Sequence, residues 1–165
     1  MDGKIATFDK LKTLLTKAYW IEKRLEETAK WYGYLQAKSN HAKDVLFQIT
    51  REAENHKSVL VELINTISDF NLEDSLKKLN FGKPQFKFEQ KNDKDIFMEI
   101  LANIEMIDEI YGKLYNTTNS ELIKNHWIKS DFNNYFNTLS WLKNQEKDLK
   151  ELLEPFVIKE LEKIH

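Results

Sequence analysis

The chain has 165 residues, a net charge of −2 and no cysteine, with 41% hydrophobic and 32% charged residues. This length fits one domain with its own core, and the even mixture of charges argues against nucleic-acid binding through a basic surface. The lack of cysteine excludes disulfides, thiolate metal sites and cysteine nucleophiles. Only four glycines and two prolines occur, which favours long helices over a β-sandwich or barrel.

No segment has the pattern of a membrane anchor or a secretion signal. No apolar run approaches the roughly 18 residues that suggest a membrane span. Residues 1–15 lack the basic stretch followed by an apolar core that is typical of a signal peptide. We therefore expect a cytoplasmic protein without a membrane partner.

Four stretches carry apolar residues at the spacing of an amphipathic helix. They cover about residues 8–38, 41–70, 93–115 and 130–153. Ser39 and Asn40 between the first two, and Ser130 with Asp131 before the last, are good helix-capping residues. Pro155 is expected to end the last helix. Residues 116–130 either extend the third helix or form a short one of their own.

A long connection, from about residue 71 to 93, separates the second helix from the third, whereas the other connections are short. Such a link can run the full length of a bundle. Two helical hairpins joined by one long crossover make the ferritin-like type of four-helix bundle, whereas a simple up-down-up-down bundle needs no such link. We therefore expect an all-α chain that forms a single ferritin-like four-helix-bundle domain over residues 1–165.

Each of the four helices places one ionisable residue among its inward apolar residues. These four are Glu22, His56, Asp108 and Glu146. Burying a charge is costly without a partner or a metal, and carboxylates with an imidazole suit iron, manganese or zinc. The alternative is a buried polar network without metal, in which Lys143 could neutralise Glu146 and His56 could hydrogen-bond to a nearby carboxylate or to Tyr111.

The helix order and these inward residues resemble the ferritin-like superfamily, specifically its rubrerythrin-like branch. Members of that branch supply a glutamate from the first and third helices, often with a tyrosine seven residues later. Glu22 matches the first glutamate, although Ala29 stands at its tyrosine position. Asp108 stands where the third-helix glutamate belongs, and Tyr115 follows it by seven residues.

The same family supplies a Glu-x-x-His pair from the second and the fourth helix, and here each pair is incomplete. The second helix reads Ala53-x-x-His56, and the fourth reads Glu146-x-x-Leu149. The resemblance therefore implies a degenerate di-iron centre that holds a single metal ion or none. If the centre were redox-active, as in a rubrerythrin-like oxidoreductase, the missing cysteines would require a separate protein as electron donor.

Two further functional hypotheses remain open from the sequence. One is a ferritin-like bundle that acts as a non-catalytic interaction protein, with the former metal site reduced to a polar network. The other is an unrelated helical binding module. Trp20, Trp31 and Tyr34 lie off the main apolar stripe, and such surface aromatic residues are common in interfaces. We expect them to pack under the crossover or to form a homodimer interface through the first two helices.

Overall fold

The structure is a computed structural model that describes residues 5–30, 37–79 and 92–162, with side chains described up to residue 157. The expected all-α class is confirmed over these residues, in which the only β-type pairings are two isolated bridges. The helices of the described residues are α1 (Phe8–Glu27), α2 (Asn40–Asn65), α3 (Leu72–Lys78), α4 (Asp93–Thr117), α5 (Ser120–His126) and α6 (Asn133–Glu162).

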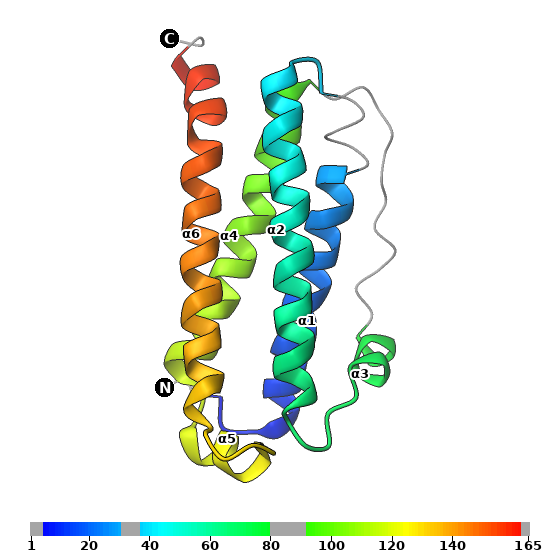
Figure 1. Cartoon of the computed structure of the whole chain (residues 1–165), viewed down its shortest axis with the longest axis vertical. Coiled ribbons are helices and arrows are strands. Elements are labelled where there is room, and N and C mark those ends of the chain that lie inside the picture. Colours follow the sequence, from blue (N-terminus) through cyan, green and yellow to red (C-terminus); the bar gives the residue numbers. More distant parts are fainter. Residues whose placement is uncertain (1–4, 31–36, 80–91, 163–165) are drawn as a thin grey trace.

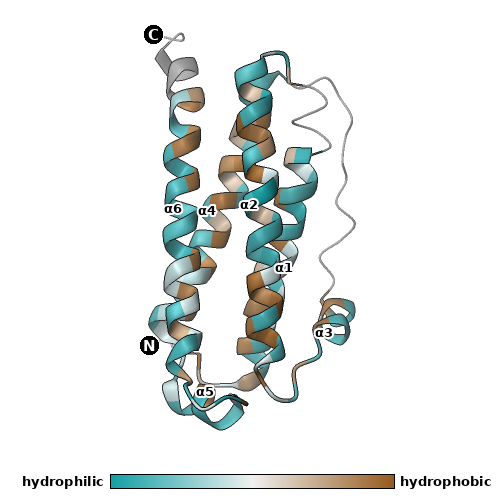
Figure 2. Cartoon of the chain, viewed as in Figure 1, coloured by the Kyte–Doolittle hydropathy of each residue, from teal (hydrophilic) through white to brown (hydrophobic). Residues whose placement is uncertain are grey.

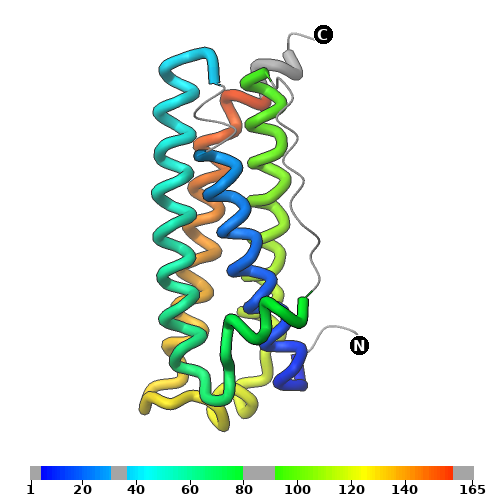
Figure 3. Tube along the Cα trace, turned by 90° about the vertical axis from the view of Figure 1, so that its right-hand side faces the viewer, coloured from blue at the N-terminus to red at the C-terminus, as the bar shows by residue number. Residues whose placement is uncertain are grey.

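The four long helices α1, α2, α4 and α6 lie side by side (Figure 1). α1 and α6 run in one direction and α2 and α4 in the opposite one, so α2 ends and α4 begins at opposite ends of the molecule (Figures 1 and 3). The short helix α3 follows α2 within the expected crossover, whose residues 80–91 lie outside the described residues. α5 lies at the end where α4 finishes and α6 begins.

Side-chain caps fix the starts of the helices where the sequence predicted them. Ser39 accepts a hydrogen bond from the backbone N–H of Ala42 at 3.0 Å and caps α2. The carboxylate of Asp131 accepts from the N–H of Asn133 at 3.0 Å, where α6 begins. Asn119 caps α5 as a separate short helix. Each such cap contributes about 1 kcal/mol, and the two predicted capping sites are confirmed.

The expectation that the last helix ends before Pro155 is wrong, because α6 continues through the proline to Glu162. A proline inside a helix removes one hydrogen bond and costs about 3 kcal/mol. Packing beyond the proline offsets this cost. The ring of Phe156 stacks on Phe97 with centroids 4.2 Å apart, and Val157 is buried. Contacts with α4 therefore help to continue α6 past the proline.

The core consists of two apolar clusters, stacked along the bundle axis. The lower cluster, on the side of α5, includes Leu60, Ile107 and Leu139. The upper cluster includes Ile104 and Leu153. Hydrophobic residues line the facing sides of the long helices, while their outer sides are mostly hydrophilic (Figure 2). The two clusters meet near the middle of α2, α4 and α6 and in the last two turns of α1, and that level carries the polar residues described below.

The aromatic residues expected on one exposed face are only partly described. Trp20 is half-buried and packs against the lower cluster, with the guanidinium of Arg24 5.5 Å from its ring centroid. The expectation that Trp20 is exposed is therefore wrong. Trp31 and Tyr34 lie outside the described residues, so the proposed dimer face stays a prediction.

Candidate metal centre

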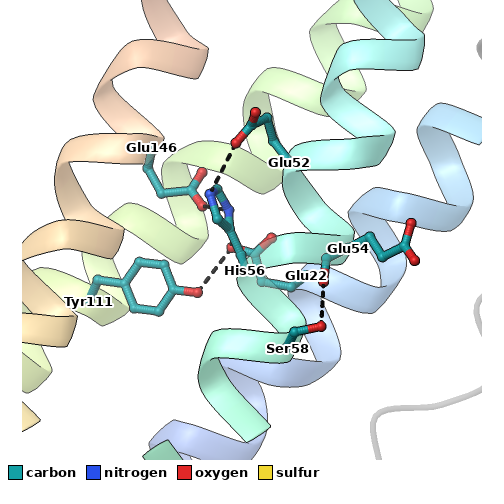
Figure 4. A network of polar contacts seen from close by, with 7 residues as sticks. All are labelled: Glu22, Glu52, Glu54, His56, Ser58, Tyr111 and Glu146. Atoms are coloured by element: carbon teal, nitrogen blue, oxygen red, sulfur yellow. Dashed lines mark hydrogen bonds and ion pairs between the residues drawn. The ribbon is translucent and has the colours of Figure 1, made fainter. Parts of the chain in front are cut away.

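Three of the four predicted ligands meet at the middle of the bundle (Figure 4). They are Glu22 on α1, His56 on α2 and Glu146 on α6, and each is 0% exposed. One ligand atom from each lies within 4.8 Å of the other two. Because they come from three helices, only the folded bundle brings them together.

The apolar residues one turn before and after each of these three positions place the side chain on the buried face of its helix. Glu22 follows Ile21, which belongs to the lower cluster, and His56 lies between Ala53 of the upper cluster and Leu60 of the lower. In the same way, Glu146 lies one turn from buried apolar residues on either side. A helical residue flanked by core positions at both i−3 or i−4 and i+3 or i+4 lies on the buried face. The polar layer therefore separates the two apolar clusters.

The imidazole of His56 is the centre of the cluster. Its Nδ1 lies 3.1 Å from Oε1 of Glu146 and 3.4 Å from Oε1 of Glu22. From α4, the hydroxyl of Tyr111 donates a hydrogen bond to the same Oε1 of Glu22 at 3.0 Å. The sequence placed Tyr111 on an apolar stripe and offered it as a hydrogen-bond partner for His56, whereas in the structure its hydroxyl donates to Glu22 instead. The signal for its role was that a buried tyrosine hydroxyl needs a partner.

Asp108, the fourth predicted ligand, is not part of this group. Its carboxylate accepts a hydrogen bond from Nζ of Lys150 on α6 at 2.7 Å, and its side chain is 23% exposed. Lys143, considered as a partner for Glu146, has its ammonium beside Gly112 on α4, where an added Cβ would lie 3.2 Å from Nζ. Tyr111, not Asp108, is thus the α4 residue at the polar layer.

Burial and neighbouring charges shift the pKa values of His56, Glu146 and Tyr111. Burial alone would lower the pKa of His56, but its contacts with Glu146 and Glu22 outweigh this and raise the pKa to about 10. Burial, followed by the charge of Glu22, raises the pKa of Glu146 well above its usual range. Burial and the two carboxylates also raise the pKa of the Tyr111 hydroxyl. At neutral pH the metal-free cluster therefore holds a protonated imidazole against the two acids.

Most polar atoms of the cluster lack a well-aligned hydrogen bond, although they are fully buried. These atoms are both ring nitrogens of His56, both carboxylate oxygens of Glu146 and Oε2 of Glu22. Buried polar atoms without partners are rare, and an ion is one of the recognised explanations. Nitrogen and oxygen ligands bound to one zinc-sized ion at about 2.0–2.2 Å lie about 3–3.5 Å apart, which matches the two Nδ1–oxygen distances. The residues present therefore fit one transition-metal ion.

The positions that would complete a second metal site are apolar. Ala53 is 0% exposed and Leu149 is 4% exposed, and both belong to the upper cluster. A further carboxylate, that of Glu52, has its Oε2 3.8 Å from Nε2 of His56, and its side chain is 34% exposed. Trp141 on α6 meets the imidazole edge-on, with ring centroids 5.9 Å apart.

Comparisons of the chain with protein-family models, with curated proteins and with solved structures found no match. None of the described helices is both long and apolar enough to cross a membrane. The buried Glu-His-Glu cluster is therefore the feature on which a functional proposal can be based.

Proposed function

We propose that this chain is a ferritin-like, rubrerythrin-like bundle whose degenerate centre binds a single divalent transition-metal ion, with iron, manganese and zinc as the candidates. Glu22, His56 and Glu146 would be the protein ligands. The observation that carries this proposal is the convergence, at full burial, of two carboxylates and one imidazole whose polar atoms otherwise lack hydrogen bonds.

The direction of the helices supports the ferritin-like part of the proposal. A bundle in which the second and third long helices run parallel requires an end-to-end crossover, and this arrangement is typical of ferritin-like folds. The apolar residues Ala53 and Leu149 favour one ion over two, because they remove one carboxylate and one imidazole from the cluster.

The protein residues around the ligands would orient them and exclude water. The hydrogen bond from Tyr111 fixes the rotation of the Glu22 carboxylate, and partners of this kind commonly tune metal affinity 10- to 100-fold. The apolar clusters above and below the layer keep solvent away from it. A bound ion would supply Lewis acidity, and iron or manganese would also supply one-electron chemistry.

Metal content tests the proposal directly. The protein is purified without chelator, incubated with Fe(II) under anaerobic conditions, Mn(II), Zn(II) or Co(II), and gel-filtered, and bound metal is measured by mass spectrometry. We expect about one ion per chain for at least one metal, and absorption bands of protein-bound Co(II). Glu146→Gln keeps the side-chain shape but removes an anionic ligand, and should weaken binding at least about 100-fold.

Asp108→Asn is the matched control, because it also neutralises an acid of the bundle but one that pairs with Lys150 outside the cluster. This variant should bind metal as the unmodified protein does. Substoichiometric binding of all four metals by the unmodified protein, or equal binding by Glu146→Gln, would contradict the proposal.

The alternative is a metal-free bundle in which His56, Glu22 and Glu146 form an internal salt bridge and the protein serves as an interaction module. The raised pKa of His56 favours this reading in the absence of metal, since a protonated imidazole cannot be a ligand. The two proposals give opposite results in the metal measurement.

A further inference from the structure

A surface hollow lies between α2 and α6 close to the polar cluster. It has a volume of about 490 Å³ and is lined by residues of these two helices. Three of its lining residues are acids, namely Glu52, Asp148 and Glu151, and the others are two glutamines and two leucines. Among the described residues that line it, none is basic. The hollow therefore offers a cation only carboxylates and neutral groups.

Glu52 connects this hollow to the buried imidazole. Its side chain is 34% exposed, yet its Oε2 reaches to 3.8 Å from Nε2 of His56 (Figure 4). Nε2 is buried and makes no hydrogen bond. While Nδ1 is near Glu22 and Glu146, the Nε2 edge of the ring is near Glu52. Glu52 is thus in contact both with the hollow and with the innermost residue of the cluster.

We propose that this hollow is the access route by which a divalent cation reaches the buried ligands, and that Glu52 is the first carboxylate to bind it. The inference rests on the proposed function. A fully buried site needs a path for its ion, and clefts lined by charges of one sign raise association rates of oppositely charged ligands by 10- to 1,000-fold. Asp148 and Glu151 would attract the cation, and Glu52 would pass it to the cluster.

The test is the rate of metal uptake, measured by stopped-flow mixing of the metal-free protein with Co(II). The indole of Trp141 lies against His56, so quenching of tryptophan fluorescence reports arrival of the ion, and Co(II) absorption reports it independently. We expect Glu52→Gln to slow uptake about 10-fold or more while the final amount bound stays near one ion per chain. Increasing salt should slow uptake by the unmodified protein more than uptake by Glu52→Gln.

Glu54→Gln is the control, because Glu54 is an exposed acid of the same helix that points away from the cluster (Figure 4). The same charge change at this position should leave the uptake rate within about twofold of that of the unmodified protein, since Glu54 lies outside the hollow. The double variant Glu52→Gln/Asp148→Asn should take up Co(II) more slowly than Glu52→Gln alone.

The possible failures are distinguishable. If the unmodified protein binds Co(II) but Glu52→Gln takes it up at the same rate, the access route is wrong and the metal proposal stands. If Glu52→Gln and Glu54→Gln slow uptake equally, the effect is one of net charge and the route is likewise wrong. If the unmodified protein binds no metal at all, both proposals fall.

Discussion

Replacing His56 by leucine in the metal-free protein should be one of the most destabilising single changes in the core. The imidazole lies 3.4 Å from a carboxylate oxygen of Glu22 and 3.1 Å from one of Glu146, and all three side chains are 0% exposed. Leucine has a similar volume, so little cavity is created. Removing one partner of a buried ionic group leaves an uncompensated charge and costs about 3–5 kcal/mol.

For a domain of this size that loss corresponds to a fall in melting temperature of roughly 6–20 °C. Equilibrium urea unfolding at pH 7 with chelator, followed by circular dichroism at 222 nm, measures the free energy of unfolding. Asp108→Asn serves as the control, since the Asp108–Lys150 pair is partly exposed and its loss should cost no more than about 1 kcal/mol.

A second variant removes the whole polar layer at once. This variant combines Glu22→Leu, His56→Leu and Glu146→Leu with Tyr111→Phe. It leaves no charge of the layer unpaired and no hydroxyl without its acceptor. Apolar replacement of buried ionic groups is typically neutral or stabilising by about 1–4 kcal/mol. This combined variant should therefore be at least as stable as the unmodified protein.

The single variant His56→Leu gives the result that would refute this reasoning. Its free energy of unfolding would then differ from that of the unmodified protein by less than about 0.5 kcal/mol, the usual range of a surface substitution.

Four other outcomes follow from the structure. Metal binding at pH 7 should release one to two protons per ion, because the pKa of His56 is about 10 before binding and that of Glu146 is raised. An indicator dye measures this release, and metal uptake without it would contradict a protonated imidazole. With chelator present, the free energy of unfolding should fall as the pH rises from about 6.5 to about 10, because a pKa raised in the folded state stabilises the fold only while the group keeps its proton. His56→Leu should lose the part of this slope that the imidazole contributes, and keep the part that comes from the raised pKa of Glu146. Tyr111→Phe should weaken metal binding about 10-fold, measured by titration, and lower the free energy of unfolding by about 0.5–1.5 kcal/mol, measured with urea. An unchanged metal affinity would mean that the hydrogen bond from Tyr111 to Glu22 does not orient a ligand. Pro155→Ala should raise the free energy of unfolding by about 1–3 kcal/mol, because it restores a backbone donor inside α6; no gain would mean that the last turns are frayed.

The sequence was sufficient for the presence and approximate starts of the four long helices and for three members of the cluster, because helical periodicity reports which side chains point inward. It did not give the helix ends: α1 ends at Glu27 and not near residue 38, and α6 continues past Pro155. It placed Glu22, His56 and Glu146 on the inward stripes, where the structure has them fully buried. It failed for Asp108 because periodicity gives a direction within a helix and not the partner opposite. A side chain at the margin of the stripe can turn to a lysine of the next helix instead, as Asp108 does with Lys150.

Two other features depend on tertiary contacts that no local pattern records. The continuation of α6 past Pro155 depends on the stacking of Phe156 on Phe97, some sixty residues away in the chain. The place of Tyr111 in the site depends on the position of Glu22 on another helix. In both cases the local preference was read correctly, and packing between helices decided the outcome.

The stability expected of the all-apolar variant bears on why the chain has a polar layer in its core. If that variant is more stable and keeps the same helix arrangement, the layer of Glu22, His56 and Glu146 is needed neither for stability nor for helix register, the two structural roles that buried polar groups can have. A ligand would then be the remaining explanation for three buried ionisable groups whose polar atoms largely lack hydrogen bonds. If the variant instead misassembles or aggregates, the layer specifies the bundle, and metal binding has to be judged from the uptake measurements alone.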